Sequence, residues 1–359
     1  MSAETAFSAG TITARRPWWP QVLLLLCTCA VLFPLMEVAV RLIAPQPASW
    51  LAIYRDHPVL PYALQPGVHA LIDTGDSRWT VHTDEHGFRV PERAAGPSGP
   101  PILLWLGDSF TFGYGVDFEK SFVGLLALDR NARHRHIDAA VGGYGPTQYR
   151  QMLEYLFNGG FRPAAVIIPV FLGNDFDDTI SDKKAPVRNG ILGDDGGLKS
   201  FFKRHFHLYR LVAAARHRLH PTGVSQGVLE MNADARAWTD GPLRQADAIF
   251  RQEFERIGSI CRSQAIDLRV LLIPGPGMVD SLEKGTSRTA DGARDQSLPR
   301  KHALSALRDL QISFLDLTPM LVEHPVTETY FFFDGHFTPR GHQLVKDAVA
   351  REWPDLLQH

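Results

Sequence analysis

The sequence predicts an α/β protein of three layers, with helices on both faces of a five-stranded parallel sheet, preceded by one transmembrane helix. Two observations predict the sheet. Short apolar runs with the length of buried strands recur from residue 102 onward, and segments with the apolar spacing of helices follow them. Strands that alternate with helices are joined by right-handed crossovers, which place the helices on both faces of one parallel sheet. A long apolar segment near the N-terminus predicts the transmembrane helix.

Composition indicates a globular, enzyme-like protein rather than a nucleic-acid-binding one. Of 359 residues, 45% are hydrophobic, and the net charge is only -2. Binding to nucleic acid is favoured by a basic excess, which this composition lacks. The three cysteines, Cys27, Cys29 and Cys261, form neither a disulfide framework nor a Cys-x-x-Cys metal pair, and no Walker loop is present. We therefore expect neither a metal nor a cofactor.

The N-terminal segment predicts a single-pass membrane anchor. Residues 1–17 are small and polar and end in Arg15-Arg16-Pro17, and an apolar segment then extends to Ala44. Residues 18–44 have about the length that a bilayer needs, and the arginines before them favour a cytoplasmic N-terminus. We expect a signal-anchor helix over 18–44 in the inner (cytoplasmic) membrane, with the rest of the chain on the periplasmic side.

A cleaved signal peptide is the alternative interpretation of this segment. It is less favoured because no small-x-small site promptly follows the apolar core, Val22–Met36, and the helical pattern continues through Arg41. Glu37 and Arg41 lie four residues apart with the acid first. The two side chains can therefore pair on one helix face near a membrane interface.

Residues 45–100 are rich in proline and glycine and predict a membrane-proximal linker with a small β element packed on the main domain. Alternation of polar and apolar residues over Arg78–Thr83 predicts an edge strand. The run Pro97–Pro101 marks a boundary. We therefore expect the main domain to occupy residues 101–359.

The main domain alternates strand and helix patterns, which gives the predicted sheet its order. The buried-strand candidates are Ile102–Leu106, Ile137–Val141, Ala165–Leu172, Leu268–Ile273 and Ile312–Leu315. The helical patterns are Glu119–Arg133, Thr147–Phe157, Leu243–Gln264, Arg300–Leu310 and Arg340–Trp353.

Residues 176–241 interrupt this alternation and predict a lid-like insertion. Within it, residues 198–219 have apolar residues at helical spacing, with lysines and arginines on other faces and no acid. The favoured interpretation is one amphipathic helix that covers the sheet or the active site. The alternative is a basic face that contacts anionic headgroups or polymer.

Ser109 is the candidate nucleophile. It follows the run Ile102–Leu106 in the sequence Gly107-Asp108-Ser109, where a strand ends and a helix begins. Ligands bind at the carboxyl ends of strands in open α/β sheets, and the first N–H groups of the next helix face them. A serine nucleophile also needs a base, an orienting acid and an oxyanion hole.

A loop near the C-terminus bears the candidate base and acid. An apolar run leads to Asp334 and His336, and Pro339 then begins the last helix. A carboxylate two residues before a histidine on a bent loop can reach the far imidazole nitrogen and fix its tautomer. Nε2 of His336 is then free for Ser109.

Two further loops supply candidate oxyanion donors. Val141–Gly145 follows the second strand, and its glycines permit a close backbone approach. Asn174 follows the third strand, and its side-chain amide can donate to a developing negative charge. With the backbone N–H of Ser109, these loops provide donors from adjacent strand ends.

The blocks Gly107-Asp108-Ser109, Gly143, Gly173-Asn174-Asp175 and Asp334-x-His336 together resemble, in this order, the SGNH (GDSL-type) hydrolase family. The resemblance covers Pro101 to the C-terminus, and the end of the predicted anchor is similar to that of membrane-anchored bacterial members. It implies a flavodoxin-like SGNH hydrolase fold and a catalytic domain over 101–359.

The same resemblance implies a role for each site residue. Ser109 is the nucleophile, His336 the general base and then acid, and Asp334 its partner. Ser109, Gly143 and Asn174 form the oxyanion hole. The acid precedes the histidine by two positions, whereas much of the family has three. Asp138 stands where many members have Asn.

Each motif also has a purely structural interpretation. The first block can be a helix N-cap, the glycines a tight turn, the asparagine block a polar loop, and Asp334 with His336 a surface pair. Their joint occurrence in this order favours catalysis. Asp175, Asp177 and Asp178 lack the glycine and the final glutamate of a calcium loop, so we interpret them as solvated residues at the base of the lid.

The expected function is that of a membrane-anchored serine esterase with a Ser-His-Asp triad and an acyl-enzyme intermediate. Its expected substrate is an acylated glycan or lipid of the cell envelope. An O-acyltransferase for an envelope polysaccharide is one alternative, because an acceptor hydroxyl can replace water. A non-catalytic glycan-binding or assembly component that retains the fold is another. The intact set of site residues argues against the last, and the sequence indicates no oligomeric state.

Overall fold

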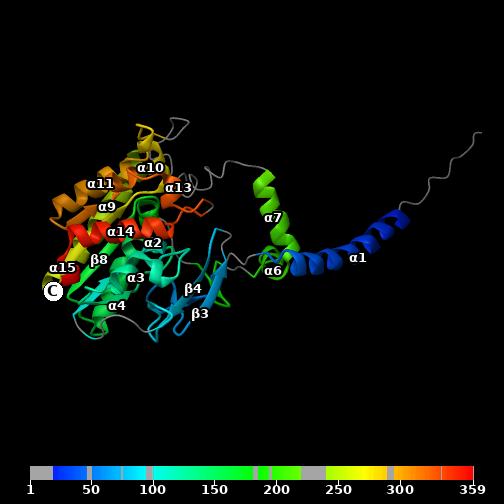
Figure 1. Ribbon diagram of the computed structural model, residues 1–359, viewed down its shortest axis with the longest axis horizontal. Helices are drawn as coiled ribbons and strands as arrows, with labels where there is room; N and C mark the ends of the chain where they lie inside the picture. Colours follow the sequence, from blue (N-terminus) through cyan, green and yellow to red (C-terminus); the bar gives the residue numbers. More distant parts are fainter. Residues whose placement is uncertain are drawn as a thin grey trace, which may run out of the picture.

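A mixed eight-stranded sheet forms the centre of the protein, in the order β12-β11-β8-β6-β7-β5-β4-β3 (Figure 1). The computed structural model describes residues 19–46, 51–73, 76–93, 99, 101–180, 185–193, 196–219, 240–288, 295–332 and 334–358. The predicted cytoplasmic segment 1–17 lies outside these residues, and the predicted boundary at 97–101 lies partly outside them.

The parallel strands that the sequence predicts are neighbours in this sheet. They are β6 (Ile102–Trp105), β7 (Arg135–Asp138), β8 (Ala165–Phe171), β11 (Asp267–Ile273) and β12 (Ser313–Asp316). Every residue of β8 is buried, which explains its uninterrupted apolar sequence. Since β6 lies between β7 and β8, the carboxyl ends of these strands adjoin at one edge of the sheet.

The small β element predicted within residues 45–100 continues this sheet. β3 (His69–Asp73), β4 (Arg78–Thr83) and β5 (Arg89–Val90) are antiparallel, and β5 pairs with β7. β4 has the predicted bounds, but the prediction of an edge strand is wrong, because β3 and β5 flank it. The buried side chains of β4, Trp79, Val81 and Thr83, alternate with more exposed ones, and such a pattern does not distinguish an edge strand from its neighbour. A short pair, β1 (Tyr54–Arg55) and β2 (Ala63–Leu64), precedes these strands.

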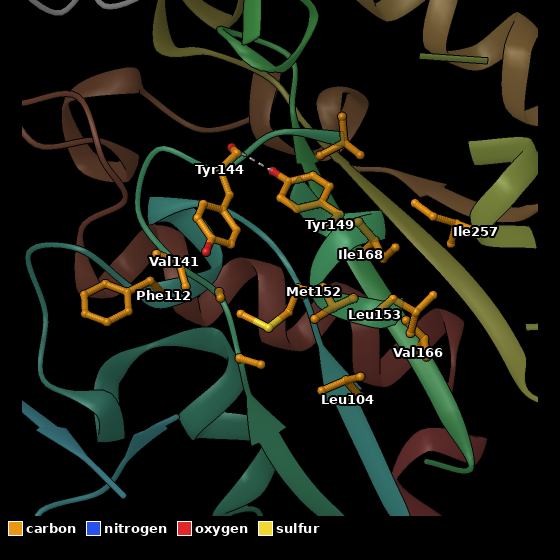
Figure 2. Close-up of a cluster of buried hydrophobic side chains, with 14 of the residues drawn as sticks. Leu104, Phe112, Val141, Tyr144, Tyr149, Met152, Leu153, Val166, Ile168 and Ile257 are labelled. Atoms are coloured by element: carbon orange, nitrogen blue, oxygen red, sulfur yellow. Dashed lines mark hydrogen bonds between the residues drawn. The ribbon is translucent and has the colours of Figure 1, made fainter. Parts of the chain in front are cut away.

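Helices cover both faces of the sheet, as the sequence predicts. Successive residues of β6 point to opposite faces: Leu104 belongs to one hydrophobic cluster, and Leu103 and Trp105 belong to the other. Figure 2 shows the first cluster, in which Leu104 lies near Met152. The helices of this face are α4 (Pro146–Asn158), α9 (Asp240–Ser263) and α11 (Leu298–Asp309), and those of the opposite face include α3 (Phe122–Ala127) and α14 (Pro339–Glu352).

Short elements complete the domain. They are α2 (Ser109–Phe112), η1 (Phe118–Lys120), α5 (Asp175–Thr179), β9 (Val187–Arg188), β10 (Ile191–Leu192), α10 (Pro276–Glu283), α12 (Thr318–Val322), α13 (Val326–Thr329) and α15 (Asp355–Gln358). The helix predicted over Glu119–Arg133 is shorter than expected. Ser121 is extended and caps α3 by accepting the N–H of Gly124, so η1 and α3 are separate, and α3 ends before Leu128.

The prediction that the basic segment 198–219 forms one helix over the sheet or the active site is wrong. The segment forms α6 (Leu198–His205) and α7 (His207–Leu219), which are separated at Phe206, where the backbone is extended. Both helices lie beside α1 (Trp19–Ile43), outside the layers that cover the sheet (Figure 1). α1 is long and apolar enough to cross a membrane, a property that signal sequences share.

Candidate active site

Ser109 lies at the turn between β6 and α2, as predicted. The N-cap of α2 is Asp108, whose Oδ1 accepts the N–H of Phe110 at 2.9 Å. Capping by Ser109 is therefore not needed, and its hydroxyl is available for another contact. A Cβ at residue 107 would lie 2.1 Å from Oγ1 of Thr111, so the close approach of this turn to α2 requires glycine.

His336 lies directly against the Ser109 side chain. Its Nε2 is 2.7 Å from Oγ of Ser109, although the two residues are 227 positions apart. The imidazole is buried and packs between the rings of Phe110 and Tyr114, at centroid distances of 4.9 and 4.5 Å. These rings hold the imidazole in an orientation that presents Nε2 to the hydroxyl.

Asp334 lies on the other side of the imidazole. Its Oδ1 is 3.5 Å from Nδ1 of His336 and accepts the backbone N–H of the same residue at 2.9 Å. The first distance is that of an ion pair rather than of a hydrogen bond. Gly335 has φ +74°, a left-handed conformation that lets a carboxylate only two residues away turn back onto the histidine. The short spacing noted in the sequence is thus compatible with a carboxylate at Nδ1.

Gly143 and Asn174 follow β7 and β8, the two strands that flank β6. A Cβ at residue 142 would lie 3.8 Å from Cβ of Ser109, so the glycine loop passes beside the candidate nucleophile. Among the described residues, the N–H of Gly143 donates no hydrogen bond, and the buried Oδ1 of Asn174 accepts none. Because Ser109 is the first residue of α2, its N–H has no acceptor within the helix.

A family comparison covers the part of the chain that holds this arrangement. Residues 105–344, more than half of the chain, match the model of the GDSL-like lipase/acylhydrolase family. The chain belongs to this family. Its fold is that of GDSL hydrolases, and an ester hydrolase is the activity that the family indicates. No curated protein matches the sequence.

Three of the solved structures similar to this GDSL-like chain are two esterases and a lipase, all of low identity. A psychrotrophic esterase from Pseudoalteromonas sp. has 12% identity and a TM-score of 0.40 over 72% of this chain and 100% of its own. An acetylxylan esterase from Geobacillus stearothermophilus has 12% identity and a TM-score of 0.39 over 71% and 95%. A GDSL-like lipase from Bacteroides thetaiotaomicron has 10% identity and a TM-score of 0.35 over 73% and 93%.

The acids near the asparagine loop of this GDSL-like hydrolase differ from the prediction. We interpreted Asp175, Asp177 and Asp178 as solvated, but Asp175 and Asp178 are buried. Asp175 accepts hydrogen bonds from the Tyr149 hydroxyl, at 3.0 Å, and from the N–H of Phe171, at 3.0 Å. Burial, together with the nearby Asp108 carboxylate, raises the pKa of Asp175. Asp175 thus anchors the turn that carries Asn174.

Sequence reasoning missed two tyrosines that lie N-terminal to the family match. The hydroxyl of Tyr62 donates to the carbonyl of Gly142 at 3.1 Å and lies 2.7 Å from the position of a Cβ at Gly143. Tyr54 packs edge-on against Tyr62, and a Cβ at residue 142 would lie 3.0 Å from its hydroxyl oxygen. The two tyrosines therefore support the glycine loop beside Ser109.

No sequence signal marks these tyrosines, since they lie in an irregular, proline-containing segment. Tyr114, whose ring packs on His336, follows the Ser109 block directly in the sequence and could have been found from that position. The carboxylate and imidazole groups of the described chain form no cluster suited to a metal ion. The groups that the arrangement offers for chemistry are the hydroxyl of Ser109, the imidazole of His336 and the backbone and amide donors.

Proposed function

We propose that this protein is a membrane-anchored serine esterase in which Ser109 is the nucleophile. The observation that carries the proposal is the 2.7 Å contact between Oγ of Ser109 and Nε2 of His336. His336 accepts the hydroxyl proton while Oγ attacks the ester carbonyl, which becomes a tetrahedral oxyanion. Asp334, on the Nδ1 side, stabilises the imidazolium that forms.

The tetrahedral intermediate then collapses to an acyl-enzyme. The imidazolium gives its proton to the leaving alcohol, and the acyl group stays on Oγ of Ser109. A water molecule, deprotonated by His336, attacks the acyl carbon and releases the carboxylic acid. When a sugar hydroxyl takes the place of that water, the same intermediate yields an O-acyl transfer.

Three donors serve the oxyanion in this proposal: the N–H groups of Ser109 and Gly143 and the side-chain amide of Asn174. They follow β6, β7 and β8, whose carboxyl ends adjoin. A donor placed for the transition state contributes about 2.7–4 kcal/mol to its stabilisation. Tyr62, through its hydrogen bond to Gly142, fixes the loop that carries one of them.

The membrane anchor in this proposal is α1, with its C-terminal end toward the periplasm. Its most apolar window has a mean hydropathy of 2.4. A tethered enzyme acts on substrates close to the membrane, so an acyl ester on a cell-envelope glycan or lipid fits better than a soluble metabolite.

Labelling with a fluorophosphonate probe tests the nucleophile in the full chain. We expect the wild type and Ser263→Ala to form an adduct and Ser109→Ala to form none. Ser263 is a matched control because it is exposed at the end of α9, where its hydroxyl donates to the carbonyl of Ile260. An adduct that persists in Ser109→Ala overturns the assignment, and no adduct in the wild type supports a binding role.

Product analysis separates hydrolysis from transfer. The same acyl-enzyme forms in hydrolysis and in transfer. A hydrolase, however, releases free acid at the same rate with or without an acceptor glycan. Acylated acceptor, formed at the expense of free acid, identifies a transferase. Both products must disappear in Ser109→Ala.

A further inference from the structure

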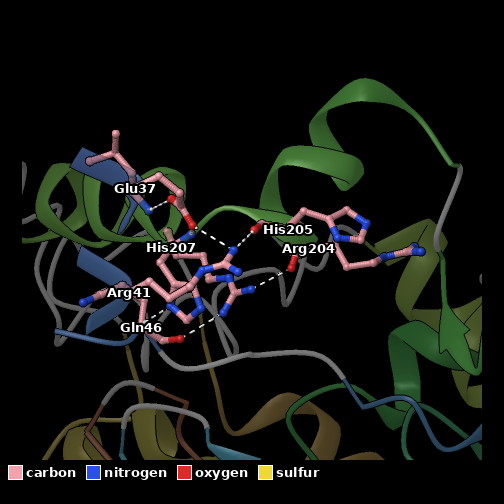
Figure 3. Close-up of polar contacts among 8 residues, drawn as sticks. Glu37, Arg41, Gln46, Arg204, His205 and His207 are labelled. Atoms are coloured by element: carbon pink, nitrogen blue, oxygen red, sulfur yellow. Dashed lines mark hydrogen bonds and ion pairs between the residues drawn. The ribbon is translucent and has the colours of Figure 1, made fainter. Parts of the chain in front are cut away.

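α6 and α7 dock on the C-terminal part of α1 through a buried carboxylate. The two carboxylate oxygens of Glu37 accept the N–H groups of His207, at 3.0 Å, and Leu208, at 2.8 Å, which belong to the first turn of α7 (Figure 3). Glu37 is only 7% exposed, although it lies on an otherwise exposed helix. The rings of Phe33 and Phe206 add an apolar contact with a centroid distance of 5.3 Å.

Further polar contacts join the same two parts of the chain. Arg41 donates to the Glu37 carboxylate at 3.0 Å and to the carbonyl of His205 at 2.8 Å (Figure 3). Beyond the end of α1, the N–H of Gln46 donates to Nδ1 of His207 at 2.8 Å, and Arg210 donates to the carbonyl of Gln46 at 2.9 Å. The α6–α7 pair is therefore attached to α1 on both sides of its last turn.

The length of α1 places this attachment at a membrane boundary. Its 25 residues span about 37 Å at a rise of 1.5 Å per residue, whereas the hydrocarbon core of a bilayer is about 30 Å thick. When the N-terminal, most apolar part of α1 fills the core, Glu37 and Arg41 lie near the headgroups. There α7 supplies the hydrogen bonds that a carboxylate needs when it leaves water.

The α6–α7 pair also has the composition of a helix that lies on a membrane. Large apolar side chains remain exposed on it: Leu198 is 73%, Phe201 48% and Val212 59% exposed. The basic residues of this segment are Lys199, Lys203, Arg204, Arg210, Arg216 and Arg218, and it contains no acid. Exposed apolar and basic residues in the absence of acids are typical of interfacial helices bound to anionic lipid.

We propose that the α6–α7 pair lies on the outer surface of the membrane that α1 crosses, with Leu198, Phe201 and Val212 at the level of the headgroups, and that its basic, acid-free composition favours anionic phospholipid. The inference rests on α1 being the membrane anchor of the proposed function. We assign a bilayer to this surface because α6 and α7 are attached to the end of α1, an apolar helix whose side chains, such as Leu35 and Met36, are themselves exposed. Two adjacent attachments then fix the orientation of the catalytic domain above the membrane.

A probe of membrane depth tests this proposal in the full chain. In a Cys27→Ser, Cys29→Ser background, Phe201→Cys is labelled with an environment-sensitive fluorophore and reconstituted in vesicles of phosphatidylcholine with phosphatidylglycerol. Cys261 need not be replaced, because it is buried and its burial raises the pKa of the thiol to about 12. We expect quenching by a spin-labelled lipid and protection from aqueous iodide, both weaker in phosphatidylcholine alone.

Labels at two other positions serve as controls, one on the water-exposed domain and one within α1. Tyr155→Cys, in an exposed position on α4, should be quenched by iodide and not by the lipid. Cys27 retained alone should be quenched by the lipid, which tests whether α1 is inserted. Iodide quenching at residue 201 equal to that at 155 overturns the proposal, as does self-quenching that rises with protein density and indicates a second copy. Labelling with the fluorophosphonate, measured in parallel, separates failure here from failure of the esterase assignment.

Discussion

Two helices of this protein begin at a carboxylate, and the two carboxylates reach them by different routes. Asp108 caps α2 from the adjacent position, where it accepts the N–H of Phe110 two residues on. Glu37 accepts N–H groups at the start of α7 from 170 and 171 positions away. The first contact is local and shapes the turn that carries Ser109. The second is made only when α1 and α7 meet.

The two carboxylates therefore have different expected roles: Asp108 affects the proposed reaction, and Glu37 affects how α6 and α7 are held. A change near the Asp108 turn alters the geometry of the Ser109 hydroxyl, the proposed nucleophile, and should therefore change the rate of hydrolysis. A change at Glu37 loosens the attachment of two helices that lie beside α1, outside the layers of the sheet domain (Figure 1). Such a change should leave the rate of hydrolysis unchanged and alter only the attachment of α6 and α7 to α1.

The largest expected effect is on the catalytic side, at Asn174. In Asn174→Ala we expect kcat to fall by about 10²–10³-fold, because one oxyanion donor is removed, with a smaller change in KM. The measurement is steady-state hydrolysis of a soluble ester. Asn158→Ala, exposed at the end of α4, is the control and should retain the wild-type rate. A loss of less than threefold at Asn174, about 0.7 kcal/mol, contradicts its role.

Asp138 provides a third buried carboxylate for this comparison. It accepts the N–H of Ala140 at 3.1 Å. Burial raises its pKa to about 7, against the lowering effect of Arg89. A carboxyl group whose pKa is raised by folding stabilises the folded state fully at pH values below its pKa in the unfolded state. This stabilisation is lost as the pH rises through its pKa in the folded state. The wild type therefore loses stability between about pH 4 and 7 relative to Asp138→Asn, by up to about 1.4 kcal/mol per pH unit.

Urea unfolding of both proteins in detergent, at several pH values, measures this difference. The amide oxygen of Asn can keep the bond to Ala140, so the variant tests ionisation rather than the loss of an acceptor. A difference in unfolding free energy that stays constant from pH 4 to 8 would show that the pKa of Asp138 is not raised in the folded state.

A smaller effect is expected when the local cap itself is removed. Asp108→Ala should lower the free energy of unfolding by about 1 kcal/mol and reduce kcat/KM, since the start of α2 and the N–H of Ser109 lose their orientation. Asp108→Asn keeps a capping oxygen and should be close to the wild type in stability. Equal losses in the two variants would indicate that the charge of Asp108, rather than its cap, matters.

The smallest effect on the reaction is expected at the distant carboxylate. Glu37→Ala should hydrolyse a soluble ester at the wild-type rate. Chymotrypsin should cleave it faster beside Phe206, because the attachment that holds α6 and α7 to α1 opens more often. Glu85→Ala, whose side chain is 88% exposed, is the control. Unchanged cleavage at Phe206 would show that Glu37 does not hold the two helices in place.

The features that could be predicted are those set by neighbouring residues in the chain, like the contact of Asp108 with α2. β6 and the Ser109 turn could be predicted because an apolar run, a glycine and a capping acid are adjacent in the sequence. The histidine loop could also be located, from Asp334, His336 and the proline that begins α14. Burial of Asp175 could not, because a run of acids has the same sequence pattern whether water or Tyr149 satisfies its oxygens.

By itself, the sequence determined the alternation of strands and helices, the apolar N-terminal helix and the residue types of the candidate site. These depend on interactions among neighbours in the chain, which periodicity and capping record. Only the tertiary structure decided that Nε2 of His336 meets Oγ of Ser109, that Tyr54 and Tyr62 support the glycine loop, and that α7 docks on Glu37. Each of these contacts joins residues that are far apart in the chain, and packing of the whole fold, rather than any local pattern, brings them together.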